Sequence, residues 1–278
     1  MHNFGKRTAK VSIVIPSWFA DGQNGKYGEN ETFWFAEKCL ERLIRVTPKN
    51  ENNYELIIID NGSTLGHEDD ATKNIELYNR VTNYFGKADI VISNNKNLGF
   101  GPACNQGFAV SRGKYIVCMN NDILVWPGWL DAMIEGLENE RLIPRAGVIM
   151  PALTKETRDA RGALLMESVD LNSNFNEYGI RAEFGSLWIA KRELLMKIAE
   201  RRGGYYVFDE DFLCGMGEDR LLWQEVRKLG FETFRTHKTR VFHQGNLTIG
   251  KIPNRKDYTI PNREKLEKKK NELWETKN

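Results

Sequence analysis

Short apolar runs that alternate with helical segments constrain the fold of this chain more than any other feature of its sequence. The runs cover Val11 to Ile15, Leu56 to Ile59, Asp89 to Ser93 and Tyr115 to Met119. Apolar residues at helical spacing cover Glu31 to Val46 and Gly101 to Val110. Strands that alternate with helices indicate βαβ units and a mostly parallel sheet. Because 278 residues lie near the upper limit of one hydrophobic core, we predict a single α/β domain.

The second half of the chain is less regular, and we expect the sheet to be completed there. Strands are expected at Ala146 to Met150, Glu183 to Ala190 and Thr239 to His243, and helices at Arg192 to Arg201 and Asp219 to Lys228.

The composition changes from Lys251 onward, where nine Lys or Arg residues stand against five Asp or Glu. We predict a domain over residues 1–250 and a basic C-terminal tail with a helix over 251–278. Along that helix four lysines alternate with three apolar residues, namely Lys265, Lys268, Lys269 and Lys270 with Leu266, Leu273 and Trp274. Such a helix either packs on its own domain through the apolar edge or holds the protein at an anionic membrane surface through the basic face.

Composition and charge exclude several classes of protein. A net charge of +2 is too small to indicate a polyanion partner, so nucleic acid is not indicated. The four cysteines, Cys39, Cys104, Cys118 and Cys214, form no CxxC pair, which favours buried free thiols in a reducing compartment. The apolar stretch near the N-terminus, about five residues long, is too short for a signal peptide or a membrane span. We therefore expect a cytoplasmic protein.

Polar residues directly follow three of the expected strands, at Pro16, at Asp60 and at Asn120-Asn121-Asp122. In parallel sheets ligands collect beyond the carboxyl ends of the strands. Asp122 with its neighbouring amide oxygens has ligand chemistry that suits Mg²⁺ or Mn²⁺, and Asp60 can accept hydrogen bonds from a base or a ribose. Both segments also have ordinary turn composition, so each pattern alone is open to either interpretation.

The segment from Asn95 to Gly107 holds three glycines and three asparagines around an expected helix start. Gly99 there allows the backbone to approach a ligand closely, and Asn97 and Asn105 supply hydrogen-bond donors and acceptors. A loop with an asparagine cap explains part of this pattern but not its whole spacing.

Two acids, Glu218 and Asp219, open an expected helix, where the helix dipole favours negative charge. Either carboxylate could instead serve as a general base. His243 ends the last apolar run and is either a core histidine or a metal ligand.

Taken in order, eight segments of the chain resemble the inverting family 2 glycosyltransferases of the GT-A fold, and within them the rhamnosyltransferase-like branch. The segments read VSIVIPS, LIIIDNGST, NNKNLGFGPACNQG, YIVCMNNDILVWPGWL, GSLWIAKRELL, FDEDF, GEDRLLWQEVRKLGF and RVFHQG, and they extend from Val11 to about Gly245. Each segment alone is weakly specific, whereas the ordered set is strongly so. The resemblance implies a nucleotide-binding α/β domain with a C-terminal helical tail.

The resemblance also implies roles for individual residues. Asp60 would recognise the nucleotide base, Asp122 would bind the metal on the diphosphate, and Asp219 would be the general base, with Glu218 as the alternative. His243 would approach the metal or the diphosphate, and Gly185 and Trp188 would line the acceptor side. The remaining donor-side candidates are Pro16, Asn97, Gly99, Asn105, Asn120 and Asn121.

The implied function is metal-dependent, inverting transfer of a hexosyl or deoxyhexosyl group from a nucleotide-diphosphate sugar to an acceptor hydroxyl, with Mn²⁺ or Mg²⁺ as cofactor. The acceptor would be a glycan, a lipid-linked sugar or another hydroxyl compound, in surface polysaccharide or glycoconjugate synthesis. Peripheral contact with the inner membrane surface through the tail is part of this interpretation.

Three departures from the family pattern concern the metal and the acceptor. The metal triplet begins with Asn120 rather than an acid, and Leu221 and Glu225 stand where the family often has a second acid and an arginine. The loop from Ser17 to Asn30 is long for its place and could be a lid or an acceptor-binding element.

Two other classes of protein stay open. A nucleotidyltransferase uses a similar domain, but usually has a glycine-rich, basic loop after the first strand, where this chain has Pro16-Ser17-Trp18-Phe19. A non-catalytic carbohydrate-binding protein on a decayed fold would make the retention of both Asp122 and Asp219 a coincidence. No GxGxxG follows the first strand, which argues against a hydride-transfer enzyme.

Overall fold

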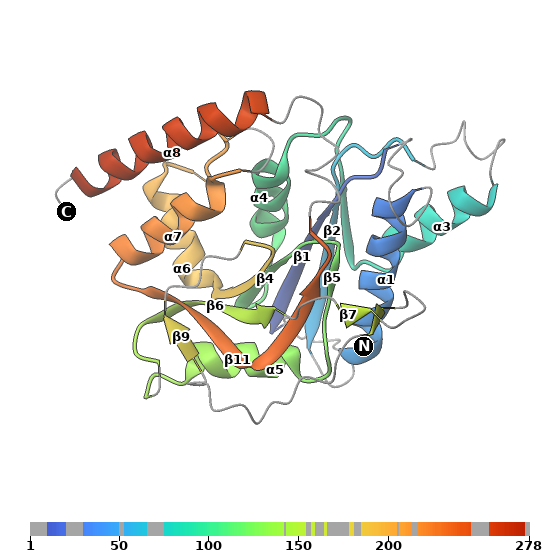
Figure 1. Ribbon diagram of the computed structural model, residues 1–278, viewed down its shortest axis with the longest axis horizontal. Coiled ribbons are helices and arrows are strands. Elements are labelled where there is room, and N and C mark those ends of the chain that lie inside the picture. The colour runs from blue at the N-terminus through green and yellow to red at the C-terminus, as the bar shows by residue number, and fades with distance from the viewer. Residues whose placement is uncertain are drawn as a thin grey trace, which may run out of the picture.

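The computed structural model (Figure 1) consists of a central sheet with helices on both faces. It describes residues 10–20, 30–49, 53–65, 75–141, 143–153, 157–158, 164–165, 178–180, 185–204, 206–212, 216–245 and 256–275.

The first half of the chain forms a parallel sheet, as predicted. Its strands are β1 (Val11–Ser17), β2 (Tyr54–Asp60), β3 (Ile90–Ser93) and β4 (Tyr115–Met119), in the spatial order β3-β2-β1-β4. All three neighbouring pairs are parallel, so the four carboxyl ends lie at one edge. This edge is where ligands collect in such sheets.

The second half continues the same sheet with mixed strand directions. Strand β10 (Leu187–Lys191) is antiparallel to both β4 and β6 (Ala146–Leu153), and β11 (Glu232–His243) is parallel to β6. The long β11 also pairs antiparallel with β5 (Ile123–Leu124) and β9 (Tyr178–Ile180). A separate two-stranded ribbon is formed by β7 (Thr157–Arg158) and β8 (Leu164–Leu165).

Alternating residues of the strands pack against two layers of helices. On one face, Ile13 and Ile15 belong to a core that is covered by α1 (Glu31–Val46), α3 (Ile75–Phe85) and α5 (Trp129–Glu138). On the other face, Val14 belongs to a core that is covered by α4 (Phe100–Val110), α6 (Arg192–Arg201) and α7 (Glu218–Lys228). Because both faces are buried, the strands are continuous apolar runs, as expected for a sheet between two helical layers.

The C-terminal helix α8 (Lys256–Glu275) lies across the outside of α7 (Figure 1). Leu266 is buried against Phe212 and Leu221, and the Trp274 ring lies 5.5 Å from Lys228 Nζ. The helix therefore packs on its own domain. The division into a domain over residues 1–250 and a tail over 251–278 stays a prediction.

The four lysines predicted to form a basic face all contact groups of the same protein. Lys269 binds Asp209 and Asp211, and Lys265 donates to the Asp211 carbonyl. Lys268 lies 3.8 Å from Glu272, and Lys270 binds Glu267 at 3.0 Å. These contacts agree with the interpretation in which the helix packs on its own domain, while contact with a membrane stays a prediction.

Several predicted boundaries differ from the structure. Pro16 was expected to stop the first strand, but β1 continues to Ser17. The Ser17 carbonyl points toward β2, where it accepts a hydrogen bond from the Asn61 amide. Because the backbone groups of successive strand residues point to opposite neighbours, those of Pro16 point toward β4. Pairing with β4 ends at Val14, so the missing N–H of Pro16 breaks no hydrogen bond of the sheet.

Other differences concern elements that were shorter in the prediction or missing from it. The last strand was expected from Thr239 but begins at Glu232, and α3 and α5 were not predicted. The long loop after β1 lies outside the described residues from 21 to 29, as does Cys214, while the other three cysteines are buried free thiols. Among the described helices, none combines the length and the apolar character that a transmembrane span requires.

Candidate active site

The carboxyl ends of β2, β1 and β4 bring three predicted site segments to one edge of the sheet. Ser17 pairs with Asp60 in register, and Asn120 follows directly after β4 on the other side of β1. Asp60 accepts a hydrogen bond from the Ser63 amide at 2.9 Å, and this local turn fixes its carboxylate at the end of β2.

Asn61, which the sequence analysis did not select, organises the loop beside Asp60. Its amide nitrogen donates to Asn97 Oδ1 at 3.0 Å and to the Gly99 carbonyl at 3.1 Å. Its oxygen accepts from Asn94 Nδ2 and from the Leu98 amide, each at 3.1 Å. A buried asparagine that satisfies both ends of its side chain fixes the loop before α4.

Two of the predicted donor-side residues are part of this loop. The Asn97 side chain holds the turn, since its oxygen also accepts from the Gly99 amide at 2.9 Å. Gly99 has a φ of 94°, a left-handed conformation that favours glycine, at the start of α4. The backbone conformation at this position therefore favours Gly99, one of the glycines singled out from the sequence.

Asp122 and His243 lie side by side at this edge because β5 pairs with the end of β11, where Ile123 is opposite His243. His243 Nε2 lies 3.2 Å from Asp122 Oδ1, and the Gly245 amide donates to Asp122 Oδ2 at 3.0 Å. Two segments that are 120 residues apart in the chain are thus joined through one carboxylate, which is only 6% exposed.

The oxygens around Asp122 suit a cation. Asp122 Oδ1 and Asn120 Oδ1 are buried, and in the described part of the chain neither accepts a hydrogen bond. Buried oxygens without donors are costly unless a ligand or an ion satisfies them. Among the described residues no three acidic, histidine or cysteine side chains surround one point, and Asp122 and His243 are the two such side chains that meet here.

The predicted acceptor side adjoins the same edge. The Asn120 amide donates to the Ser186 carbonyl at 2.8 Å, which places the start of β10 beside the metal triplet. The next residue back, Gly185, lies against Asp219, since a Cβ on this glycine would lie 2.5 Å from Asp219 Oδ2. The structure therefore brings Gly185 and Asp219 together, and only glycine leaves room for the carboxylate at this distance.

Glu218 and Asp219 occupy different environments at the start of α7. Glu218 is 2% exposed, and in the described structure its Oε2 has no hydrogen-bond partner. Burial, together with the charge of Asp219, raises the pKa of Glu218 to about 8. Because this pKa lies above 7, Glu218 carries a proton at neutral pH. Asp219, by contrast, is half-buried, and its Oδ1 accepts a hydrogen bond from the Arg220 amide at 2.7 Å.

Trp188 and Asn105 lie in positions that differ from their predicted roles. The Trp188 side chain is 0% exposed, and its ring packs edge-on against Trp223 at 5.7 Å, so it contributes to the core rather than to an acceptor surface. Asn105 is buried, and its amide binds the backbone of Phe208 in both directions and the side chain of Glu210. Its hydrogen-bonding groups are thus used within the protein rather than offered to a donor nucleotide.

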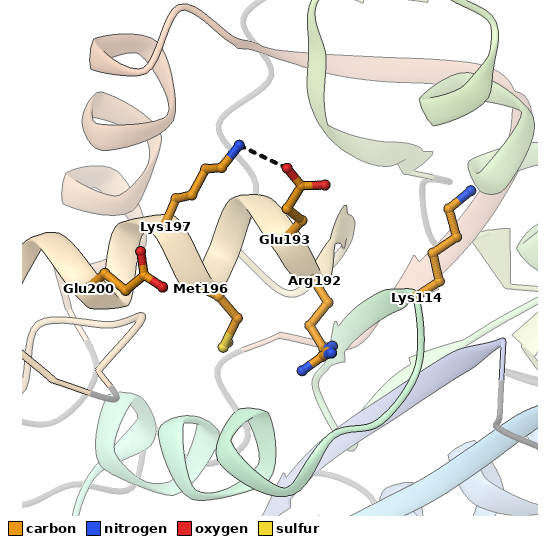
Figure 2. Close-up of a pocket in the computed structure, with 6 residues that line it drawn as sticks. All are labelled: Lys114, Arg192, Glu193, Met196, Lys197 and Glu200. Carbon is orange, nitrogen blue, oxygen red and sulfur yellow. Dashed lines mark hydrogen bonds and ion pairs between the residues drawn. The ribbon is translucent and has the colours of Figure 1, made fainter.

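A groove of about 430 Å³ lies at the opposite end of β4, between Lys114 and helix α6 (Figure 2). Arg192 and Met196 point to one side of α6, while Glu193 and Lys197 form an ion pair of 2.8 Å on another. Because Lys114 precedes β4, this groove is at the amino edge of the parallel strands, away from Asp122. We therefore do not assign it to the active site.

Comparisons with known proteins identify the family and the fold of the chain. Residues 30–199 match the model of the family described as Glycosyl transferase family 2. An uncharacterized glycosyltransferase of Haemophilus influenzae is 25% identical over 201 residues, which cover 70% of this chain and 58% of that protein. The chain therefore spans less than two thirds of the length of this relative.

Two solved structures resemble the fold over most of this chain. One is GalNAc-T7 with UDP, GalNAc and Mn²⁺, with a TM-score of 0.55, 15% identity, and coverage of 86% of this chain and 44% of that chain. The other is the mannosyltransferase PcManGT from Pyrobaculum calidifontis in complex with GDP-Man and Mn²⁺, with a TM-score of 0.53, 17% identity, and coverage of 86% and 57%. At these identities the likeness shows the fold alone, which is the GT-A fold predicted from the sequence.

Proposed function

The chain belongs to glycosyl transferase family 2 and has the GT-A fold, and on this basis we propose that it transfers a sugar from a nucleotide-diphosphate donor to an acceptor hydroxyl with inversion and with the help of a divalent cation. The observation that carries the proposal is the arrangement of Asp122 with His243 beside Asp219 along one edge of the sheet.

The donor half of the site is proposed around Asp122. Asp122 Oδ1 and His243 Nε2 would hold Mn²⁺ or Mg²⁺, and the diphosphate oxygens would complete the coordination. When bound, the cation would neutralise the charge that builds up on the departing diphosphate. The Asn120 oxygen, two residues before Asp122, is buried and accepts no hydrogen bond from the described residues, which supports this placement.

The nucleoside is proposed to lie over β1 and β2. Asp60 is fixed at the end of β2 by its turn, where it can accept hydrogen bonds from the base. The loop that Asn61 holds, including Asn97 and Gly99, adjoins Asp60 and would contact the donor mainly through its backbone, since the Asn97 oxygen is already engaged. Pro16 and Asn121 stay predicted contacts of this half.

Asp219 is proposed as the general base. The acceptor hydroxyl would give its proton to Asp219 while its oxygen forms the new bond to the anomeric carbon, and the nucleoside diphosphate would leave with the electrons of the broken bond. Glu218 is a poor base at neutral pH because it is buried and protonated, with a pKa of about 8. Gly185 would keep the space in front of Asp219 open on the acceptor side.

Finer features of the function are proposals from the sequence. They comprise a hexosyl or deoxyhexosyl donor, a role in surface polysaccharide or glycoconjugate synthesis, a cytoplasmic location and contact with the inner membrane surface. The structural neighbours were solved with UDP and with GDP-Man, so UDP-linked and GDP-linked sugars are the first donors to test.

Product analysis tests the proposal. The protein would be incubated with Mn²⁺ and UDP-linked or GDP-linked sugars, with water or simple glycosides as acceptors. We expect release of the nucleoside diphosphate, and we expect it to be lost in Asp219→Asn but retained in Asp131→Asn, a control at an exposed acid on α5. Release of sugar 1-phosphate from these donors, or of pyrophosphate when a nucleoside triphosphate and a sugar 1-phosphate are supplied in their place, would indicate a nucleotidyltransferase instead. Donor binding without any release would indicate a binding protein.

A further inference from the structure

The segment Phe208–Phe212, here called the acidic segment, lies against the start of α7, the helix that carries the candidate base. It carries three consecutive acids, Asp209, Glu210 and Asp211, and precedes α7 in the chain. A Cβ placed on Gly101 of α4 would lie 3.4 Å from Phe208 Cβ and 3.7 Å from Glu218 Cγ, so the segment and Glu218 lie against the same point of α4. The Phe212 ring packs on Gly217, the residue before Glu218, since a Cβ there would lie 2.7 Å from the ring.

Helix α4 fixes the first residue of the acidic segment. The Phe208 amide donates to Asn105 Oδ1 at 2.8 Å, and Asn105 Nδ2 donates to the Phe208 carbonyl and to Glu210 Oε1, each at 2.9 Å. The Phe208 ring is buried beside Phe108 and Trp188. These contacts leave the two aspartates of the segment to be held from another side.

Helix α8 holds those two aspartates through one lysine. Lys269 Nζ lies 2.7 Å from Asp209 Oδ2 and 2.6 Å from Asp211 Oδ2, and its side chain is only 23% exposed. Burial opposes the charge of Lys269, but its hydrogen bonds to the two aspartates raise its pKa, and the same bond lowers the pKa of Asp211. Leu266, about one turn before Lys269, packs on Phe212 and Leu221.

Removal of the lysine would leave Asp209 and Asp211 without their shared cation. Asp209 would keep only the longer contact of 3.9 Å with Arg202, and two like charges so close in the chain favour a more open arrangement. Charge-assisted hydrogen bonds of the kind that Lys269 makes are about twice as strong as neutral ones. Because Phe212 packs directly on Gly217, a shift of the segment would be passed on to the start of α7.

We propose that Lys269 is a positioning residue of the transfer reaction: by bridging Asp209 and Asp211 it clamps the acidic segment against the start of α7, and so fixes the carboxylate of Asp219 on the acceptor side. The proposal rests on the function proposed above for Asp219. It assigns the C-terminal helix a role in catalysis that does not require a membrane. A displacement of about 1 Å at a catalytic group can lower a rate by about a hundredfold.

Three variants test the clamp in the full-length protein. Lys269→Met removes the charge while keeping most of the chain length, and Lys269→Arg keeps the charge. Lys268→Met is the matched control, because Lys268 is the neighbouring residue on the same helix, is 76% exposed and lies 3.8 Å from Glu272.

Hydrogen exchange of the protein alone gives the first readout. In Lys269→Met we expect amides of residues 206–222 to exchange about tenfold faster, whereas those of residues 115–124 keep their rates. Lys269→Arg should restore most of the protection, and Lys268→Met should match the parent. Unchanged exchange over residues 206–222 in Lys269→Met would overturn the clamp.

Kinetics with the UDP-linked or GDP-linked sugar that the parent turns over give the second readout. In Lys269→Met we expect kcat to fall between about tenfold and a hundredfold with the donor KM within about twofold of the parent, and Lys269→Arg to recover most of kcat. An unchanged kcat despite faster exchange would show that the clamp does not position Asp219. If the parent releases no nucleoside diphosphate at all, the proposed function fails, and the exchange measurement still decides whether Lys269 holds the segment.

Discussion

Substitution of Glu218 by glutamine gives a pH-dependent stability effect whose size follows from the structure. Glutamine has nearly the same shape but cannot ionise. The pKa of Glu218 is raised from 4.5 to about 8 by burial and by the charge of Asp219. Each tenfold change in proton affinity corresponds to about 1.4 kcal/mol, so the full difference corresponds to at most about 5 kcal/mol.

The sign of the effect follows from which state holds the proton. Below about pH 4.5 Glu218 is protonated in both the folded and the unfolded protein, and burial carries no ionic cost. Between pH 4.5 and 8 the unfolded chain loses this proton while the folded protein keeps it, so the stability of the parent falls as pH rises. Glu218→Gln lacks this loss, and we expect its stability relative to the parent to increase by about 3 to 5 kcal/mol over that range.

Urea denaturation of the parent, Glu218→Gln and Glu200→Gln at several pH values between 4.5 and 8 measures this difference. The other ionisable groups are common to the proteins and cancel in the comparison. Glu200 is exposed on α6, so its substitution should give a difference that does not change with pH. A difference for Glu218→Gln that is equally flat would refute the argument that Glu218 is buried and protonated.

Three further predictions concern the two halves of the site and the tail. Asp122→Asn should weaken the Mn²⁺-dependent binding of UDP or GDP by at least about tenfold in calorimetry. The substitution removes the charge of the metal ligand but keeps an oxygen for the hydrogen bond from the Gly245 amide. An affinity equal to that of the parent would show that Asp122 does not bind the metal. Asp219→Asn should keep the nucleotide affinity within about twofold of the parent and lower turnover by about a hundredfold or more. Turnover close to that of the parent would show that another residue is the general base. The proposed contact with an anionic membrane surface predicts measurable sedimentation with anionic vesicles at low salt, weaker at physiological salt and in Lys268→Glu. Weak sedimentation that is equal for the parent and this variant would contradict that contact and leave α8 a structural element only.

Regular elements were predictable where one local pattern determined both the element and its burial. Helices α1 and α6 and strand β4 have the bounds predicted for them, because apolar spacing decides which face of a helix, or which run of a strand, enters the core. Helix α5 was missed although Leu130, Met133 and Leu137 show the same spacing and are buried. The early part of β11 was missed because Arg235 and His237 interrupt its apolar run, and only its pairing with β6 makes it a strand.

The candidate site was predictable where it depended on strand ends. Asp60, Asn120 and Asp122 lie along one edge because parallel strands end at the same edge of a sheet, and this can be inferred from the order of strands and helices in the sequence. The burial of Trp188, the internal hydrogen bonds of Asn105 and the bridge from Lys269 depend on packing between segments far apart in the chain. No local pattern distinguishes a tryptophan or a lysine that faces solvent from one that tertiary packing encloses.

We propose that Asp122 and His243 hold the cation of a nucleotide-diphosphate donor at the carboxyl edge of the sheet. A crystal of the protein grown with UDP and Mn²⁺, measured at a wavelength where manganese scatters anomalously, would locate this cation. We expect an anomalous peak within coordination distance of Asp122 Oδ1 and His243 Nε2, with the diphosphate on its open side and the base toward Asp60. A manganese peak and a nucleotide bound elsewhere in the protein, away from these two side chains, would contradict it.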